Sequence, residues 1–354
     1  MASVTYWAVA RRILTALLGL APLTILIHFF VHPGSNVDFV LAALSLVPLA
    51  WLIGEATEHA AHHTGPGVGG FLNATFGNAP ELIIALFAVA DGLNEVVRGS
   101  LTGSVVGNLL LVLGFSLLFG GRGALDRPSS FLSIGLVGLA VVLLLIPAVP
   151  SWEGDPERHS LAVLSVVPSV ILLIVYVAVT WYSLRRHRLM HVADDPAALT
   201  GWSFRTSLLV LGAATAVTAL IAEILVGSID EFADSVGLSE FFVAAVIVAI
   251  VGNAAEHGGA VVVAARGNIK LAAEIALASS AQVAVFLIPA VALLSWLIDP
   301  LALSFRPVEI AVLAISTVVT AALLADGQSS RLKGVILILA YVGAATAFYL
   351  AGDR

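Results

Sequence analysis

The sequence contains no cysteine, and only 11% of its 354 residues are charged. The absence of cysteine excludes disulfide bonds, thiolate metal sites and a thiol nucleophile. A soluble domain carries roughly 25% charged residues, so a soluble protein is excluded as well. The 16 Lys and Arg residues form no large basic cluster, which argues against a nucleic-acid partner. Hydrophobic residues, in contrast, make up 60% of the chain.

The hydrophobic residues are concentrated in long uncharged runs. Several exceed the roughly 18 residues that a helix needs to cross about 30 Å of hydrocarbon: 99–121, 128–152, 159–184, 275–298 and 334–352. The uncharged run 13–37 is long enough to stay in the bilayer, so we interpret it as the first span and not as a signal peptide. In total, the pattern predicts an all-α polytopic membrane protein with about eleven spans, centred near residues 21, 49, 80, 109, 140, 171, 215, 250, 285, 316 and 343.

Positive side chains are predicted to face the cytoplasm. With the N-terminus inside, twelve Lys and Arg residues lie in cytoplasmic connections, and only Arg98, Arg158, Arg306 and Arg354 lie outside. The positive-inside rule therefore predicts a cytoplasmic N-terminus and an external C-terminus, in what we expect to be the cytoplasmic (plasma) membrane. Acidic residues gather on the outer side, as solvated loop charge or as a vestibule that attracts cations.

A short motif occurs twice in the chain. Gly-Asn-Ala-Pro-Glu at 77–81 recurs as Gly-Asn-Ala-Ala-Glu at 252–256, 175 residues later, and the same offset carries Ser104 onto Ser279. This match predicts two five-span repeats, which are inverted because five is odd. Inverted repeats place a substrate site at mid-membrane, where broken helices meet. The expected segments are an N-terminal helix (1–37), a first repeat (38–184), a cytoplasmic linker (185–204) and a second repeat (205–354).

Glu81 and Glu256 are the strongest candidates for a functional site. A bare carboxylate in the membrane costs on the order of 2.5 to 3.5 kcal/mol, so two matching ones indicate function. Pro80 removes a backbone donor beside Glu81, and free carbonyl groups are expected there. Together with the amide oxygens of Asn78 and Asn253, these groups form an all-oxygen cage suited to a hard cation such as Ca2+.

Other polar residues near the motifs admit two interpretations. Ser104 and Ser279 are either helix-packing hydroxyls or site residues. Gln282 and Asn108 are buried amides with or without a ligand or gating role. His257 follows Glu256 but points to another side of a regular helix, so it either packs or participates.

A polar stripe is expected near the cytoplasmic end of the second span. Glu55, Glu58, His59 and His62 lie at i, i+3, i+4 and i+7, which places them on one helical face. The stripe either relays protons and admits cations or consists of water-exposed charges. Glu223 is the counterpart of Glu55 in the second half and is expected deep in the seventh span.

These motifs resemble the cation/proton exchanger family of the calcium/cation antiporter superfamily. The resemblance is carried by GNAPELII at 77–84, GSVVGNLLLVLG at 103–114, GNAAEH at 252–257 and SSAQVAVFLIP at 279–289. With the eleven spans, it covers nearly the whole chain. Family members often carry an acidic helix between the halves. Residues 185–205 here begin with basic residues and contain only two acids, so the resemblance gives no support for regulation by such a helix.

The resemblance implies a secondary transporter and not an enzyme. It implies export of Ca2+ in exchange for protons by alternating access, with no cofactor. The implied shared Ca2+/H+ ligands are Glu81 and Glu256. The residues implied nearby are Asn78, Asn253, Ser104 and Gln282, and the implied gate or proton-pathway acids are Glu55 and Glu223.

Three questions stay open at this stage. A Na+/Ca2+ or monovalent cation/H+ exchanger is the close alternative, although residues 279–283 offer no further carboxylate for sodium. The histidines at 28–32, 59–63 and 187–191 mimic the boxes of a membrane di-iron oxidase, but the first group is expected at the opposite membrane face from the others. The sequence does not decide whether the chain forms a homo-oligomer.

Overall fold

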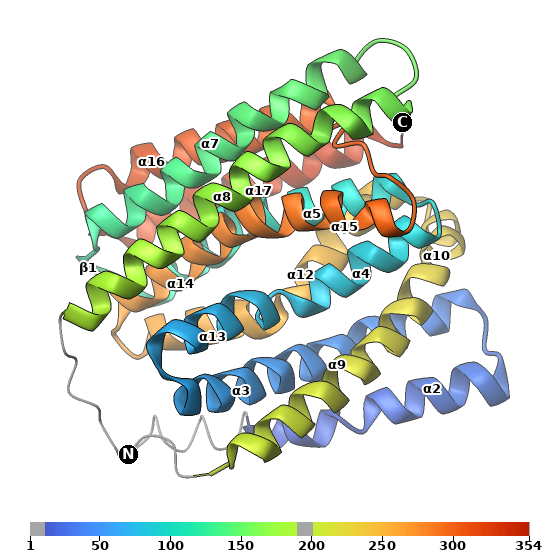
Figure 1. Ribbon diagram of the computed structural model, residues 1–354, viewed down its shortest axis with the longest axis horizontal. Helices are drawn as coiled ribbons and strands as arrows, with labels where there is room; N and C mark the ends of the chain where they lie inside the picture. Colours follow the sequence, from blue (N-terminus) through green and yellow to red (C-terminus); the bar gives the residue numbers. More distant parts are fainter. Residues whose placement is uncertain (1–10, 190–200, 354) are drawn as a thin grey trace.

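The computed structural model describes residues 11–189 and 201–353, which are almost entirely helical (Figure 1). The helices of the first half are α2 (Leu20–Val31), α3 (Ser35–Phe76), α4 (Ala79–Ala90), α5 (Asn94–Val106), η1 (Gly107–Val112), α6 (Leu113–Gly120), α7 (Arg127–Ser151) and α8 (His159–Leu189). Those of the second half are α9 (Phe204–Gly227), α10 (Ile229–Val236), α11 (Glu240–Phe242), η2 (Val243–Val248), α12 (Ala249–Gly252), α13 (Ala254–Ala265), α14 (Ile269–Gln282), η3 (Val283–Leu287), α15 (Ile288–Leu294), η4 (Ser295–Leu297), α16 (Pro307–Leu324) and α17 (Arg331–Ala351). A short antiparallel ribbon pairs β1 (Gly123–Ala124) with β2 (Gln328–Ser329).

The predicted all-α polytopic membrane fold is confirmed, but the count of eleven spans is not. Within the described ranges, nine helices are long and apolar enough to cross a membrane, or ten if the pair α10 and α11–α12, bent by 107°, is one span. The expected spans near residues 80 and 250 are the interrupted ones. Their helices α4 and α13 have 12 residues each. Such a helix is about 18 Å long, too short to cross alone.

The helices are arranged with a buried centre between two outer groups. Helices α2, α3 and α9 lie on one side, α7, α8, α16 and α17 on the other, and α4, α5 and α12–α15 between them (Figure 1). In the span Asn94–Gly120, 83% of the apolar window is buried, against 11% in Arg11–Val31. Most polar residues of α5 are therefore enclosed by protein, whereas the first span is largely exposed at the surface of the bundle.

The two halves of the chain meet at equivalent positions. The Oγ of Ser280 on α14 donates to the carbonyl oxygen of Val105 on α5 at 3.3 Å, and these residues are 175 positions apart. Each of these helices continues into a π-helical turn, η1 after α5 and η3 after α14. Turns of this kind are frequent at functional sites. The contact is what a pseudo-two-fold axis between α5 and α14 produces.

Helix α5 crosses η2 at very close range. A Cβ atom added at Gly103 would lie 1.9 Å from the carbonyl oxygen of Ala245. Only glycine permits this approach, because any larger residue would require the two backbones to separate. The crossing places Ser104 next to the broken region of the second half.

Substituting Gly103 by Ala is expected to destabilise the protein by about 3 kcal/mol, since overpacking against a rigid backbone cannot be relieved by a side-chain movement. Gly107→Ala is the matched control on the same continuous helix, because a Cβ there meets nothing within 4 Å. Thermal unfolding in detergent should show a lower Tm for Gly103→Ala alone. Equal Tm values for the two variants would contradict the close crossing.

A buried ion network joins the two halves at one end of the bundle. The guanidinium of Arg98, 1% exposed, contacts the carboxylates of Glu95 at 2.5 Å and Glu157 at 2.9 Å. Arg306 contacts Glu95 at 3.6 Å and the fully buried Glu309 at 3.3 Å. Removing one member of such a network leaves the others as uncompensated buried charge.

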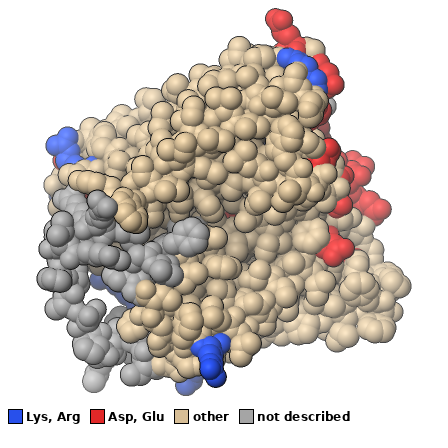
Figure 2. Space-filling model, in the orientation of Figure 1, with Lys and Arg blue, Asp and Glu red and all other residues tan. Residues whose placement is uncertain are grey.

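Charge is segregated between the two ends of the helices. Figure 2 shows Asp and Glu gathered at the end where α10 and the C-terminus lie, and Lys and Arg mainly toward the opposite end. Exposed residues at the acidic end include Glu153, Asp155, Asp230, Glu231 and Asp234, and those at the basic end include Arg122, Arg127, Arg205, Lys270 and Arg331. The surface between the two ends is largely uncharged in this view.

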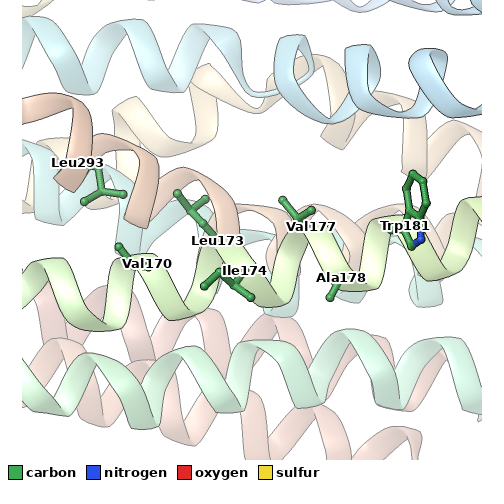
Figure 3. Close-up of a pocket in the computed structure, with 7 residues that line it drawn as sticks. All are labelled: Val170, Leu173, Ile174, Val177, Ala178, Trp181 and Leu293. Carbon is green, nitrogen blue, oxygen red and sulfur yellow. The ribbon is translucent and has the colours of Figure 1, made fainter.

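An outward-facing groove between α8 and α15 has a volume of about 490 Å³. Its lining is entirely apolar, as Figure 3 shows: Val170, Leu173, Ile174, Val177, Ala178, Trp181 and Leu293. It offers no ligand for an ion, and its chemistry matches the acyl chains of a bilayer.

Candidate functional site

Glu81 lies at the start of α4, directly after the break at Gly77 and Asn78. Glu81 is only 7% exposed and lies in the first turn of the helix. The amino-terminal end of a helix carries a partial positive charge, which favours a carboxylate there. A Cβ atom built on Gly252 would lie 3.4 Å from Cγ and 3.7 Å from Oε1 of Glu81. The first acid therefore packs against the second copy of the motif.

Asn253 connects the second break to α5. Its Nδ2 donates to the Oγ of Ser104 at 2.9 Å and to the carbonyl oxygen of Ala249 at 3.0 Å. Asn253 and Ser104 are 1% and 2% exposed. The asparagine of the second motif is thus fixed to a hydroxyl group of the first half.

Two further hydrogen bonds connect the first half to α14. The Nδ2 of Asn78 donates to Oε1 of Gln282 at 3.3 Å, and the Nδ2 of Asn108 donates to the Oγ of Ser279 at 3.0 Å. The structure thus brings Asn78, Asn253, Ser104, Ser279 and Gln282 into contacts between the two halves. Asn108, whose role the sequence leaves open, belongs to the same network.

Two amide oxygens in this network are suited to bind a cation. In the described part of the chain, the buried Oδ1 atoms of Asn253 and Asn108 have no hydrogen-bond donor. A buried acceptor without a partner costs free energy comparable to a lost hydrogen bond, and a bound cation removes this cost. Neutral amide oxygens and carboxylates such as that of Glu81 are ligands that hard cations such as Ca2+ prefer.

Glu256 occupies the position in α13 that Glu81 occupies in α4. Both helices follow an asparagine with similar backbone angles, φ −101° and ψ 16° at Asn78 and φ −93° and ψ 6° at Asn253. Each acid is therefore in the first turn after its break. The side chains of Glu256 and His257 lie outside the described residues, so their roles stay predictions.

The structure does not bring Glu55 and Glu223 into the central network. Glu55 on α3 contacts Arg11, with 2.5 Å between Nη2 and Oε1. Glu223 is exposed and lies one turn before the end of α9 at Gly227. The sequence instead predicts a position deep in the span. Because α3 and α9 run in opposite directions (Figure 1), the two acids lie toward opposite ends of the bundle.

The expected polar stripe on α3 is not uniform. The ring of His59, 7% exposed, stacks on Trp202 with centroids 4.9 Å apart, whereas Glu58 and His62 are exposed. His28 lies in the last turn of α2 and contacts Asp38 in the first turn of α3, whereas His59 lies 21 residues further along α3. This separation is unsuited to one shared di-iron site. His191 lies outside the described residues.

Comparison with known proteins gives consistent matches over most of the chain. The Ca(2+)/H(+) antiporter of Synechocystis sp. is 35% identical and covers 96% of this chain and 97% of its own length. The vacuolar cation/proton exchanger 1a of rice (Oryza sativa subsp. japonica) is 40% identical, covering 88% of this chain and 74% of its own length. The solved structure of native YfkE, 35% identical, matches with a TM-score of 0.81 over 95% of this chain and 99% of that one.

A family profile matches the chain twice. The profile described as sodium/calcium exchanger protein matches residues 35–185 and 206–350, which together contain α4, α5, α13 and α14 and thus the whole network described above. The protein therefore belongs to the sodium/calcium exchanger protein family.

Proposed function

We propose that this protein is a secondary antiporter that exports Ca2+ from the cytoplasm in exchange for protons. The observation that carries the proposal is the buried Glu81 beside Gly252, within a network of amide and hydroxyl oxygens from both halves. Relatives that match nearly full length are named Ca(2+)/H(+) antiporters. The ions are substrates, and the protein itself supplies all the ligands.

The proposed mechanism rests on charge neutralisation. Glu81 and Glu256 are two carboxylates in a low-dielectric region, and the empty, doubly negative site is costly to carry through a closed state. Either one divalent cation or two protons cancels this charge. The carrier then changes its access only when one of these passengers is bound, so Ca2+ efflux is coupled to proton entry. The titration belongs to the pair of acids and not to either residue alone.

The proposal includes an orientation in the cytoplasmic membrane. The basic end of the bundle faces the cytoplasm and the acidic end faces outward, with the N-terminus inside and the C-terminus outside. Acidic side chains at the outer end raise the local concentration of cations. The segments 1–37, 38–184, 185–204 and 205–354 remain the proposed division of the chain.

A sodium-coupled exchanger is the second candidate, because the family description names sodium. Sodium coupling would require additional oxygen ligands near the centre. Between 279 and 283 the chain offers two serines and Gln282 but no carboxylate, and Gln282 already accepts from Asn78. These residues favour protons as the counter-ion.

Transport in everted membrane vesicles tests the proposed function. Respiration acidifies the lumen, and Ca2+ added to a sodium-free medium is expected to raise the luminal pH, followed by acridine orange fluorescence. Vesicles without the protein are the control. An unchanged luminal pH, together with uptake of radioactive Ca2+ that requires a sodium gradient, would support the sodium-coupled alternative instead.

A further inference from the structure

A polar cavity lies outside the central network, between α2, α3 and α9. Its volume is about 300 Å³, and it is lined by residues of α2, α3 and α9 and by Ser228, which follows α9. His28 on α2, Asp38 on α3 and Glu223 on α9 are its titratable side chains. Ser35, also in the lining, contacts Glu231 of α10, which is the acidic group next to the cavity.

His28 and Asp38 form a direct pair within this cavity. Nδ1 of His28 and Oδ2 of Asp38 are 2.9 Å apart, and the side chains are 35% and 11% exposed. A carboxylate accepts hydrogen bonds, so the neutral imidazole places its proton on Nδ1 and its free lone pair on Nε2. His28 is thus a base that water can reach, held by a buried acid.

When His28 is neutral, few interactions compensate the negative charge of Asp38. In the described residues, its buried Oδ1 has no hydrogen-bond partner. Glu223 adds a second negative charge to the cavity, and no Lys or Arg lines it. Protonation of Nε2 converts the pair into an ion pair and lowers the net charge of the three side chains from −2 to −1.

The cavity is mechanically connected to the central site. Helix α9 carries Glu223 and packs along α3 and against α4, whose first turn holds Glu81. A proton bound between α2, α3 and α9 thus changes the charge on helices that enclose the site.

We propose that the His28–Asp38 pair is a proton-binding site on the outer face, which makes exchange depend on the external pH. The inference rests on the proposed function and adds to it a proton-binding site on the outer face. Histidine is the side chain whose charge ordinarily changes between about pH 5 and 8.

The test compares a neutral and a permanently charged replacement. In everted vesicles, whose lumen corresponds to the outer face, the initial rate of Ca2+ uptake is measured against luminal pH at constant external pH. His28→Gln is expected to need about tenfold more protons, or one pH unit lower, for the half-maximal rate. His28→Arg carries a permanent positive charge beside Asp38, so its half-maximal rate is expected at a higher luminal pH than that of the wild type.

His32→Gln is the matched control, since His32 is exposed and lies one turn further along the same segment. Its profile should equal that of the wild type. Unchanged profiles in both His28 variants overturn the proposal, and so does loss of uptake at every pH in both, which would make the pair purely structural. No Ca2+ uptake by the wild type would instead refute the proposed function.

Discussion

Replacing Glu81 by Gln is expected to lower the rate of Ca2+-dependent proton movement by about 100-fold or more. Loss of an outer-shell partner already costs 10- to 100-fold in metal affinity, and a direct ligand costs at least as much. The substitution keeps the size of the side chain but removes the charge that both passengers neutralise. The measurement is the luminal pH change after Ca2+ addition to everted vesicles.

Glu256→Gln is expected to have the same effect, because its position in α13 repeats that of Glu81 in α4. Glu153→Gln is the control, since Glu153 is an exposed acid in the connection between α7 and α8. Full exchange by either site variant would remove that acid from the central role. Equal amounts of inserted protein must be confirmed by detection in the membrane.

Replacing Arg98 by Met is expected to lower the free energy of unfolding by about 3–5 kcal/mol, the usual cost of removing one partner from a buried ion pair. Methionine fills much of the volume, but it leaves the carboxylates of Glu95 and Glu157 without their guanidinium partner. The measurement is thermal unfolding in detergent, followed by scanning fluorimetry.

The control for this prediction is Arg122→Met, because Arg122 is exposed at the opposite end of the bundle. It is expected to unfold within about 0.5 kcal/mol of the wild type. A double variant, Arg98→Met with Glu95→Gln, should recover part of the lost stability because it removes one of the stranded charges. An Arg98→Met protein as stable as the control would contradict a structural role for the network.

The sequence predicts the membrane helices well because their hydrophobic runs are local. In the part of the chain that the structure describes, nine helices coincide with expected spans. The two remaining expected spans are interrupted, one at Gly77-Asn78 and the other at Asn253. Gly77 and Pro80 indicate in the sequence that the helix unwinds there, but they do not show that the helix after the break has only 12 residues. The polar network was also accessible in part, since Asn78, Asn253 and Ser104 belong to repeated motifs.

Contacts between distant segments were not predictable in this way. Arg98 is counted as an outer loop charge in the sequence, yet it is buried because Glu157 and Ser304, 59 and 206 positions away, come to meet it. The pairing of Asp38 with His28 is not predictable for the same reason, since only the fold brings the two side chains together. Glu223 lies less deep than the sequence predicts, because α9 ends at Gly227, three residues before the first charged residue, Asp230.

The contact between Ser280 and Val105 has an evolutionary consequence. When a residue touches its own counterpart in a duplicated sequence, two separate copies of the ancestral segment would touch at the same position. A half-length ancestor inserted in both directions could therefore dimerise through this helix crossing before the two genes fused. In the fused chain, one copy has kept or acquired a hydroxyl group where the other has valine, so the two faces of the crossing have since been free to diverge.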